Sequence, residues 1–357
     1  MNSPGDSPRP ETDAADHSAV LPHDSLPLAV TLGDPAGIGA EVAAKVIARP
    51  GAATSGRPLL FVGCRWALLE GARAAGCESA VAAIATVDAP HELQGRLGLL
   101  DLGGDRGDFE FGAVSASCGA VAVQAVEQAA GYCLAGSVAG MVTCPINKAA
   151  IHAAGFVGDL GHQEILARIT GASWTATMLM TPGLRVVHLS THKSLVEAAR
   201  FVTCDNVLQK LTLAQQTLTR WGLPGARIAV AALNPHGGES GILGREEIDE
   251  IAPAVAAARE AGVDAIGPVP ADSVFNRAIA GEFDVVLAMY HDQGHIAIKV
   301  HDFHGSTTAT LGIPFVRTSV DHGTAFDIAG KGVADERGLR AAIDAGNALV
   351  DGQLARL

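Results

Sequence analysis

The sequence predicts an α/β fold that is built around a largely parallel β-sheet. Short apolar runs rich in β-branched residues alternate with helical stretches of about ten to fifteen residues, and this alternation is typical of βαβ units. The apolar runs are almost unbroken, as expected for strands that are covered on both faces of a sheet. The length of 357 residues allows about two domains or one large α/β unit.

The first predicted unit covers residues 26–49 and consists of the strand LPLAVTL, the loop GDPAGIG and the helix AEVAAKVIAR. The loop matches neither the Rossmann fingerprint nor the Walker loop, so we interpret it as a tight turn, with Asp34 as a candidate polar group of the active site. Further strands are predicted, in order, at PLLFVG, VAGMVTC, LRVVHLS, RIAVAAL and DVVLAMY. Ligands of open parallel sheets bind beyond the carboxyl ends of the strands, so functional side chains are expected directly after these runs.

Composition and charge exclude several classes of protein. The hydrophobic fraction of 48% is sufficient for a buried core and excludes a wholly disordered chain. The 38 acidic residues outnumber the 25 basic residues, which gives a net charge of −13 and disfavours nucleic acid or an anionic membrane as the main partner. No apolar stretch approaches the ~18–20 residues that are needed to cross a bilayer.

The composition of the first residues and the spacing of the cysteines indicate the cellular compartment of the protein. Residues 1–26 are rich in Pro, Ser, Asp and Ala, so we expect a disordered leader rather than a secretory signal. The six cysteines form no CxxC pair and are expected to be reduced, mostly buried thiols. These features predict a soluble cytoplasmic protein.

Three histidines occupy equivalent positions after predicted strands. His192, His236 and His291 each follow an apolar run within a few residues. If the three strands are neighbours, the imidazoles can converge on one divalent cation, because neutral imidazole is the commonest metal ligand in proteins. The sequence leaves Zn²⁺, Co²⁺, Mn²⁺ and Mg²⁺ open, although an all-histidine set argues against Mg²⁺. His188 and His295 could support this site, but ordinary strand-end histidines are the simpler interpretation of both.

Other polar residues suggest a pocket for an anion. The loop GDLGHQE contains His162, Gln163 and Glu164, which fit either substrate binding or the beginning of a helix. Lys299 and Arg317 stand in apolar runs, where a buried cation needs a partner. Together they could bind a phosphate or a carboxylate, and the alternative for each is a snorkelling or salt-bridged side chain.

The stretch DHGTAFDIAGKGVAD, residues 321–335, is more specific. It resembles the HGSAPDIAGKG loop of the isopropylmalate and isocitrate dehydrogenases, which bind NAD(P) without a Rossmann fold. The resemblance implies that His322, Gly323, Thr324 and Asp327 hold the adenosine half of the cofactor. An acidic residue that faces the ribose 2′-hydroxyl favours NAD over NADP, because a 2′-phosphate would meet a like charge.

Eight motifs extend the resemblance over nearly the whole chain beyond the leader. In order they are GDPAGIG, CPINK, GHQE, THKSL, LNPHGGE, PADSVF, MYHDQGH and FVRTSVDHGTA. Together they resemble the 4-hydroxythreonine-4-phosphate dehydrogenase family of pyridoxal phosphate biosynthesis and its paralogues, with an isopropylmalate-dehydrogenase-like fold. The resemblance implies a first α/β domain with the cofactor loop at 27–150 plus 305–357. It implies a second α/β domain at 151–304, which carries the metal, substrate and dimer contacts, and an interdomain cleft.

The same resemblance assigns roles to individual residues. The three histidines that follow the predicted strands match the metal ligands of the family, in which the one in YHDQG comes from the other subunit of a homodimer. The active site would therefore lie at the dimer interface. Lys299 and Asp272 are the candidate catalytic residues, and a metal-bound water is the alternative to Lys299 as the base. The implied substrate contacts are His162, Gln163, Asp272, Lys299, Thr308 and Arg317.

Two of these positions depart from the family pattern. Gln163 replaces a Thr and Thr308 replaces an Asn, and each change alters the hydrogen-bonding groups that face the substrate. The resemblance implies NAD- and divalent-metal-dependent oxidation of 4-phosphohydroxy-L-threonine to a 3-keto acid, with decarboxylation. The alternative is a paralogue that acts on 4-phosphothreonate, 4-phosphoerythronate or an aromatic cis-dihydrodiol carboxylate. A metal-dependent hydrolase or lyase and a non-catalytic binding protein remain rivals. The HGTAFDIAGKG loop argues against the first rival, and the histidine trio argues against the second.

Overall fold

The computed structural model describes residues 26–49, 57–104, 106, 107, 109–159 and 161–357. The expected leader lies outside the described residues except for Leu26. The strands are β1 (Leu28–Thr31), β2 (Leu59–Gly63), β3 (Ala85–Val87), β4 (Leu97–Asp101), β5 (Gly140–Thr143), β6 (Ala176–Thr181), β7 (Leu184–His188), β8 (Ile228–Ala231), β9 (Ala265–Val269), β10 (Val285–Ala288), β11 (Thr307–Leu311) and β12 (Val316–Val320).

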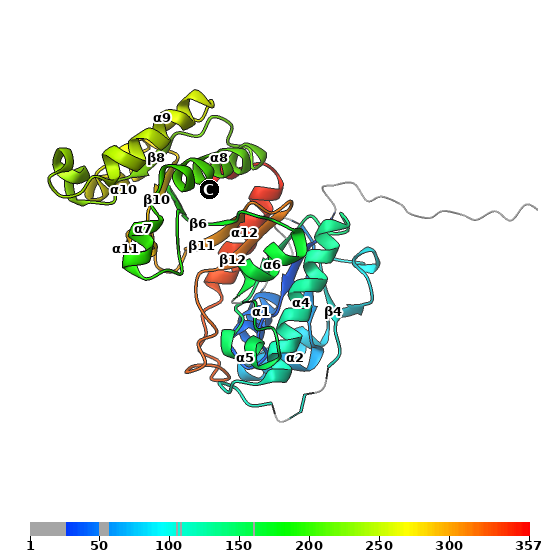
Figure 1. Cartoon of the computed structure of the whole chain (residues 1–357). Helices are drawn as coiled ribbons and strands as arrows, with labels where there is room; N and C mark the ends of the chain where they lie inside the picture. Colours follow the sequence, from blue (N-terminus) through cyan, green and yellow to red (C-terminus); the bar gives the residue numbers. More distant parts are fainter. Residues whose placement is uncertain (1–25, 50–56, 105, 108, 160) are drawn as a thin grey trace, which may run out of the picture.

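The helices lie between these strands and on both faces of the sheet (Figure 1). They are α1 (Gly39–Ala48), α2 (Arg65–Ala74), α3 (Glu78–Ala82), α4 (Ala116–Leu134), α5 (Lys148–Ala153), α6 (His162–Thr170), α7 (Leu195–Phe201), α8 (Cys204–Arg220), α9 (Ala252–Glu260), α10 (Ala271–Ile279), α11 (His291–His301) and α12 (Arg337–Val350). Shorter 3₁₀ and π turns are η2 (Pro90–Glu92), η3 (Pro235–Gly241), η4 (Glu247–Ile251) and η5 (Leu354–Arg356).

All twelve strands belong to one sheet, in the order β3-β4-β2-β1-β5-β12-β11-β6-β7-β10-β8-β9. The block from β3 to β12 is parallel, and so is the block from β7 to β9. Between them, β11 pairs antiparallel with both of its neighbours, and β6 pairs antiparallel with β7. The two parallel blocks therefore run in opposite directions, and the predicted α/β class with a largely parallel sheet is confirmed.

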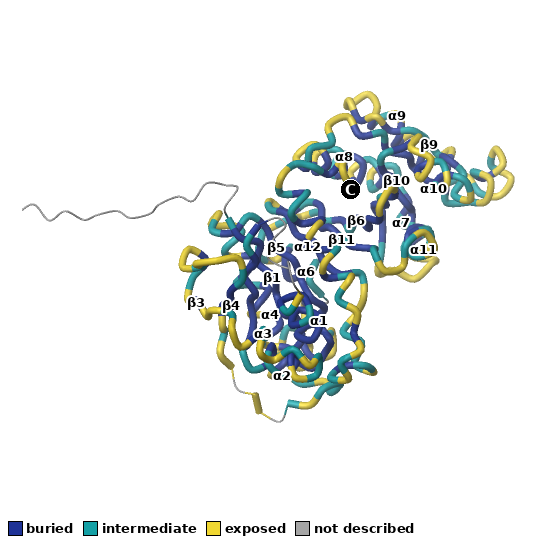
Figure 2. The backbone as a smooth tube through the Cα atoms, turned by 180° about the vertical axis from the view of Figure 1, so that it is seen from behind, coloured by how far each residue is buried: buried dark blue, intermediate teal, exposed yellow. Residues whose placement is uncertain are grey.

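The hydrophobic core explains why the predicted strands were almost unbroken apolar runs. Every residue of β1, β5, β8, β10 and β12 is buried, because helices cover both faces of the sheet. Figure 2 shows this buried interior in two lobes. Helix α12 contributes Leu339 and Ile343 to the core cluster of one lobe, and Ala345 and Leu349 to that of the other. Helix α12 therefore packs into both lobes. The predicted domain boundaries stay a prediction.

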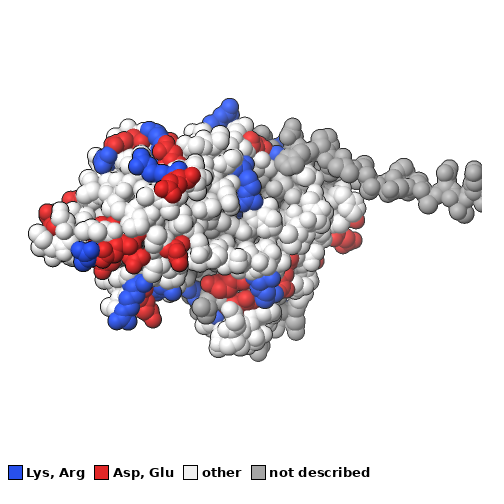
Figure 3. Space-filling view, turned by 45° about the horizontal axis from the view of Figure 1, so that its top comes forward, with Lys and Arg blue, Asp and Glu red and all other residues white. Residues whose placement is uncertain are grey.

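The surface carries charged side chains of both signs. On the face shown in Figure 3, acidic and basic side chains of the described residues are interspersed with uncharged surface. Among the residues that the structure describes, no helix has both the length and the apolar character that a membrane crossing requires.

Replacing either of two glycines in α4 by alanine should change the free energy of unfolding in opposite directions. A Cβ added at Gly119 would lie 2.1 Å from the Ala150 carbonyl oxygen of α5, whereas a Cβ at Gly131 would meet nothing within 4 Å. We expect Gly119→Ala to lower the free energy of unfolding by about 1–3 kcal/mol through overpacking. Gly131→Ala should raise it by about 0.5–1 kcal/mol through helix propensity. Urea denaturation of both variants measures this, and equal effects would contradict the α4–α5 packing.

Candidate active site

The three histidines that were predicted to bind a metal follow three neighbouring strands. Strand β10 lies between β7 and β8 and is parallel to both, so the carboxyl ends of the three strands share one edge of the sheet. His192 lies in the loop after β7, His236 lies in η3 after β8, and His291 begins α11 after β10. The condition for convergence, that the strands be neighbours, is therefore met.

Two of these imidazoles are held by carboxylates in a way that suits a metal ligand. The Nδ1 atom of His236 lies 2.8 Å from Oε1 of Glu239, and Nδ1 of His291 lies 2.7 Å from Oδ1 of Asp292. Histidines that bind metals commonly use one ring nitrogen for a carboxylate and the other for the metal. The imidazole donors therefore fit a divalent cation such as Zn²⁺. Among the described residues, no three or more His, Cys, Asp or Glu are grouped so that they could hold a metal.

The loop that carries His236 is strained and firmly anchored. All five residues from His236 to Ser240 have positive φ angles, between 46° and 80°. The carboxylate of Glu247, which is 2% exposed, accepts hydrogen bonds from the backbone amides of Leu233 and Asn234 at 2.8 and 2.7 Å. Strained backbone of this kind persists only where surrounding contacts enforce it, and it concentrates at functional sites.

Two further histidines pack against His291. The ring of His295 stacks on the ring of His291 with a centroid distance of 3.5 Å and an angle of 12°. The ring of His188 lies beneath, with its centroid 4.7 Å from that of His295. Burial, followed by the charge of His295, lowers the pKa of His188 to about 3, so this ring is neutral. His188 and His295 therefore belong to one histidine cluster with His291.

The guanidinium of Arg317 is buried near the middle of the sheet, and it is bound only to hydroxyl groups. Nε and Nη2 donate to Oγ1 of Thr143 on β5 at 3.1 and 2.6 Å, and Nη1 donates to Oγ1 of Thr310 on β11 at 3.0 Å. Burial lowers the pKa of Arg317 to about 10, and no nearby carboxylate within the described chain contributes to this pKa. A buried cation that lacks a counter-ion fits a site for a phosphate or carboxylate.

His162 and Thr308 lie beside this arginine. Burial and the positive charge of Arg317 hold the pKa of His162 well below its usual range, so its imidazole is neutral. The Nε2 atom of His162 is buried without a hydrogen-bond partner among the described residues. Thr308 lies two residues before Thr310 on β11, and the alternation of a strand places both on the same face. The structure thus brings His162 and Arg317 together, and it places Thr308 on the neighbouring strand.

Lys299 is bound by a network that the sequence did not reveal. Its Nζ atom lies 2.7 Å from Oδ2 of Asp321, and it donates to the carbonyl oxygen of Asp321 at 3.0 Å and to Oγ of Ser306 at 3.1 Å. These three acceptors account for the three N–H groups of an ammonium. The partner that a cation in an apolar run needs is therefore Asp321. The role of Lys299 as a base stays a prediction, because that role would require release from this network.

A cavity of about 270 Å³ lies between Lys299 and the predicted cofactor loop, and Ile38, His304, His322 and Asp335 contribute to its wall. His322 is exposed, and its Nδ1 atom lies 3.0 Å from the Gly323 carbonyl oxygen. A concave site with an exposed imidazole on its wall fits part of a nucleotide.

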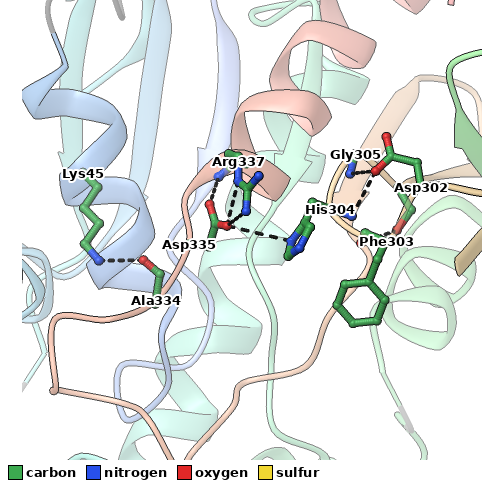
Figure 4. Close-up of polar contacts among 9 residues, drawn as sticks. Lys45, Asp302, Phe303, His304, Gly305, Ala334, Asp335 and Arg337 are labelled. Atoms are coloured by element: carbon green, nitrogen blue, oxygen red, sulfur yellow. Dashed lines mark hydrogen bonds and ion pairs between the residues drawn. The ribbon is translucent and has the colours of Figure 1, made fainter.

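The cofactor loop is fixed to the turn GDPAGIG and to α1. The amide of Ile38 donates to the Thr324 carbonyl oxygen at 3.1 Å, and the buried carboxylate of Glu41 accepts from the Ala334 amide at 2.8 Å. Figure 4 shows Lys45 reaching Ala334. Asp327 is exposed and does not line the cavity of about 270 Å³, so its contact with a ribose stays a prediction.

The same close-up shows Asp335 between Arg337 and His304 (Figure 4). The Arg337 guanidinium lowers the pKa of Asp335 to about 2, so this carboxylate is ionised at neutral pH. His304 Nδ1 lies 3.9 Å from the same carboxylate. Asp335 therefore adds a fixed negative charge to the wall of the cavity.

The remaining predicted residues lie elsewhere. Asp272 is exposed in the first turn of α10 and does not line the cavity beside the cofactor loop. Gln163 turns its amide toward Thr175 and donates to Oγ1 at 3.0 Å. Gln163 and His192 line a second cavity, which is about 460 Å³ in volume. The structure therefore does not place Asp272 or Gln163 against Arg317.

Sequence reasoning missed Thr143, Thr310, Asp321 and Glu247. Thr143 had an available signal, because it lies at the carboxyl end of the predicted strand VAGMVTC, and Asp321 is the first residue of the loop 321–335 that the sequence singled out. Glu247 had none, since it reaches back over 14 residues to Leu233.

The chain is similar to known dehydrogenases over about nine tenths of its length. It is 44% identical over 319 residues to 4-hydroxythreonine-4-phosphate dehydrogenase of Beijerinckia indica, which covers 89% of this chain and 93% of the relative. It is 42% identical over 325 residues to D-threonate 4-phosphate dehydrogenase of Cupriavidus necator, which covers 90% and 97%. The chain is therefore a dehydrogenase with an α/β fold.

The matching family model identifies the family. The chain belongs to the family described as pyridoxal phosphate biosynthetic protein PdxA, whose model matches residues 56–346.

Solved structures agree with this membership. A crystal structure of 4-hydroxythreonine-4-phosphate dehydrogenase from Klebsiella pneumoniae is similar with a TM-score of 0.82 and 38% identity, and the match covers 91% of this chain and all of that one. A terephthalate 1,2-cis-dihydrodiol dehydrogenase from Burkholderia xenovorans is similar with a TM-score of 0.62 and 29% identity, over 91% and 98% of the two chains.

The buried carboxyl of Asp34 predicts a pH-dependent stability. Its Oδ1 atom accepts from the Ala36 amide at 2.9 Å, Oδ2 has no partner within the described chain, and burial raises the pKa of Asp34 to about 6. The folded state therefore binds a proton that the unfolded state releases near pH 4, and stability falls as the pH rises from about 4 to about 6. Asp34→Asn should remove this loss and add at most on the order of 3 kcal/mol at pH 8, with no gain near pH 4.

Thermal unfolding of Asp34→Asn between pH 4 and pH 8 measures this effect. Asp88→Asn, which removes an exposed carboxylate instead of a buried one, is the control. A constant difference between Asp34→Asn and the natural protein would contradict the raised pKa.

Proposed function

We propose that this protein is an NAD- and divalent-metal-dependent dehydrogenase of a four-carbon hydroxy acid 4-phosphate. It oxidises the C3 hydroxyl to a ketone, and the 3-keto acid then loses its carboxylate as CO₂. The observation that carries the proposal is the buried Arg317, whose cation has hydroxyl partners and no counter-ion among the described residues. A doubly charged phosphate at this point would supply the missing anion.

Individual residues of this chain would have separate roles in binding and positioning the substrate. When bound, the divalent cation supplies Lewis acidity at the substrate hydroxyl, and NAD supplies the acceptor for hydride. Arg317 uses three of its five N–H groups on threonine hydroxyls and keeps two for phosphate oxygens. Neutral His162 adds its unpaired Nε2, and Lys299, fixed by Asp321, adds a cation between this site and the cofactor cavity. We keep Lys299 and Asp272 as the proposed catalytic residues.

Two substrates share this chemistry and differ at C2. 4-Phosphohydroxy-L-threonine has an amino group there, and D-threonate 4-phosphate has a hydroxyl group. Relatives of similar identity are named for each substrate. An aromatic cis-dihydrodiol carboxylate has support only from a less similar solved structure. We therefore retain the two phosphorylated acids as the candidate substrates.

We further propose that the enzyme works as a homodimer with the active site at the interface. One chain offers the proposed ligands His192, His236 and His291 without gathering three of them, so a second chain would complete the set. Most of the exposed large hydrophobic residues of the described chain lie in the lobe that carries these histidines, which supports a subunit contact there. They are Leu195, Val196, Ile242, Leu243, Ile248, Ile279, Ile296, Val300 and Phe303.

The proposed compartment is the cytoplasm. All six cysteines are free thiols, and three of them, Cys64, Cys118 and Cys144, are buried. Free thiols of this kind fit a reducing compartment.

A turnover assay tests the function. Purified protein with NAD and Zn²⁺, Co²⁺ or Mn²⁺ should reduce NAD in the presence of 4-phosphohydroxy-L-threonine, D-threonate 4-phosphate or erythronate 4-phosphate, with release of CO₂. Binding of NAD without turnover of any of these phosphorylated acids would contradict the proposal.

His236→Ala tests the metal site. Because His236 is an exposed loop residue with one carboxylate partner, its removal should spare the fold and lower Co²⁺ affinity by about 10–100-fold or more. Isothermal titration with Co²⁺ measures this directly, and NAD binding should be unchanged. The exposed His91 provides the control variant His91→Ala. Unchanged Co²⁺ affinity in His236→Ala would remove His236 from the ligand set.

Asp327→Asn tests the cofactor loop. Loss of the exposed carboxylate should raise the KM for NAD and relax discrimination against NADP by about tenfold, because a 2′-phosphate would no longer meet a like charge. The ratio of kcat/KM for the two cofactors is the measurement. Glu260→Gln, on the exposed face of α9, is the control. An unaltered ratio in Asp327→Asn would exclude Asp327 from the cofactor site.

A further inference from the structure

The cavity of about 460 Å³ beside His192 is a second polar site. Its wall comes from the beginning of α6, the segment before β6, the loop after β7, and α8. The charged side chains on this wall are Glu164, Lys193 and Lys210. Two lysines and one carboxylate leave the cavity with an excess of positive charge.

Lys210 is the unusual member of this wall. Its side chain is 4% exposed, and its Nζ atom donates to the Thr175 carbonyl oxygen at 2.9 Å and lies 5.3 Å from the ring centroid of Trp174. Burial lowers the pKa of Lys210 to about 8, and no carboxylate of the described chain offsets that burial. An ammonium has three N–H groups, so two are left for a ligand. A buried cation without a counter-ion is costly, and an anionic ligand in the cavity would relieve that cost.

Thr175 connects Lys210 to a residue that departs from the family pattern. Gln163 donates from Nε2 to Oγ1 of Thr175 at 3.0 Å, while Lys210 binds the carbonyl oxygen of the same residue. The preceding residue, His162, lies beside Arg317 instead. The beginning of α6 therefore serves two sites, with His162 at the phosphate pocket and Gln163 at the cavity of Lys210.

The position of the cavity indicates which end of the substrate it receives. His192, one of the proposed metal ligands, lies on the same wall. Thr177 on β6 also lines the cavity, and it pairs in register with Thr310, which binds Arg317, so the cavity adjoins the pocket of Arg317. If the phosphate occupies that pocket, then the other end of a four-carbon acid, C1 and C2, would lie toward this cavity. That end carries a carboxylate in both candidate substrates, and C2 carries an ammonium in one and a neutral hydroxyl in the other.

We propose that Lys210 makes this cavity the subsite for the carboxylate end of the substrate and selects 2-hydroxy acids over 2-amino acids. The inference rests on the proposed function and narrows it to the phosphates of four-carbon sugar acids. Lys210 attracts the carboxylate, and it repels an ammonium on C2 within a poorly solvated cavity. Gln163 keeps Thr175, and through it Lys210, in place.

Lys210→Met tests the proposal by removing the charge while keeping an apolar side chain of similar length. The natural protein should prefer D-threonate 4-phosphate to 4-phosphohydroxy-L-threonine. In Lys210→Met the ratio of kcat/KM for the two substrates should fall by about tenfold or more, through a higher KM for the hydroxy acid and little change in kcat. Arg259→Met, on the exposed face of α9 and outside the cavity, should change the ratio by less than about threefold. Lys210→Arg should keep the preference of the natural protein.

A structural role for Lys210 predicts a different result. If the lysine only anchors Thr175, then Lys210→Met should impair both substrates equally and lower thermal stability, and the ratio should not move. That outcome overturns the proposal. A natural protein that prefers the amino acid substrate overturns it as well.

A binding measurement separates this proposal from the proposed function. Trp174 lies on the wall of the cavity, so its fluorescence should respond to D-threonate 4-phosphate without NAD, and Trp174→Phe should remove that response. If the natural protein binds this probe and Lys210→Met does not, the subsite stands even where no turnover is seen and the proposed function fails. If turnover is seen and Lys210→Met binds the probe as tightly as the natural protein, the function stands and the subsite is refuted.

Discussion

The buried guanidinium of Arg317 holds together the part of the sheet where its direction changes. Strand β12 ends one parallel block, and β11 and β6 lead into a second block that runs the opposite way. Arg317 binds Thr143 on β5 and Thr310 on β11, so it ties three adjacent strands together through hydroxyl groups. Because these partners are neutral, the charge remains available for an anion. Under the proposed function, structure and substrate recognition would therefore depend on the same side chain.

The positions of the three proposed metal-binding histidines follow from the second block. Parallel strands β7, β10 and β8 place His192, His291 and His236 at one edge, and short-range carboxylates orient two of the rings. The strained loop of η3 presents one of them outward at a cost that buried Glu247 offsets. A single chain thus positions the three proposed metal-binding histidines apart from one another. The proposed homodimer would bring ligands from two chains together at one metal site.

The cofactor loop is attached to the first block by contacts that do not involve a ligand. The carboxylate of Glu41, from α1, accepts an amide of the loop, and the Thr324 carbonyl accepts an amide of the turn GDPAGIG. Asp321 begins the same loop and holds Lys299 from the other lobe. The network of Lys299 therefore spans the two lobes next to the proposed hydride-transfer site, which gives a physical reason for cofactor and substrate sites to be coupled.

The sequence by itself determined the α/β class, six of the twelve strands that the structure describes, and the positions of three histidines after three strands, because hydrophobic periodicity and strand-end position are local properties. It also carried the family motifs. Only the tertiary structure decided that Asp321 pairs with Lys299, that Glu247 anchors the loop of His236, and that Gln163 faces Lys210 rather than Arg317. These contacts join residues from separate elements. Because the packing of those elements depends on the whole fold, no local sequence pattern predicts the contacts.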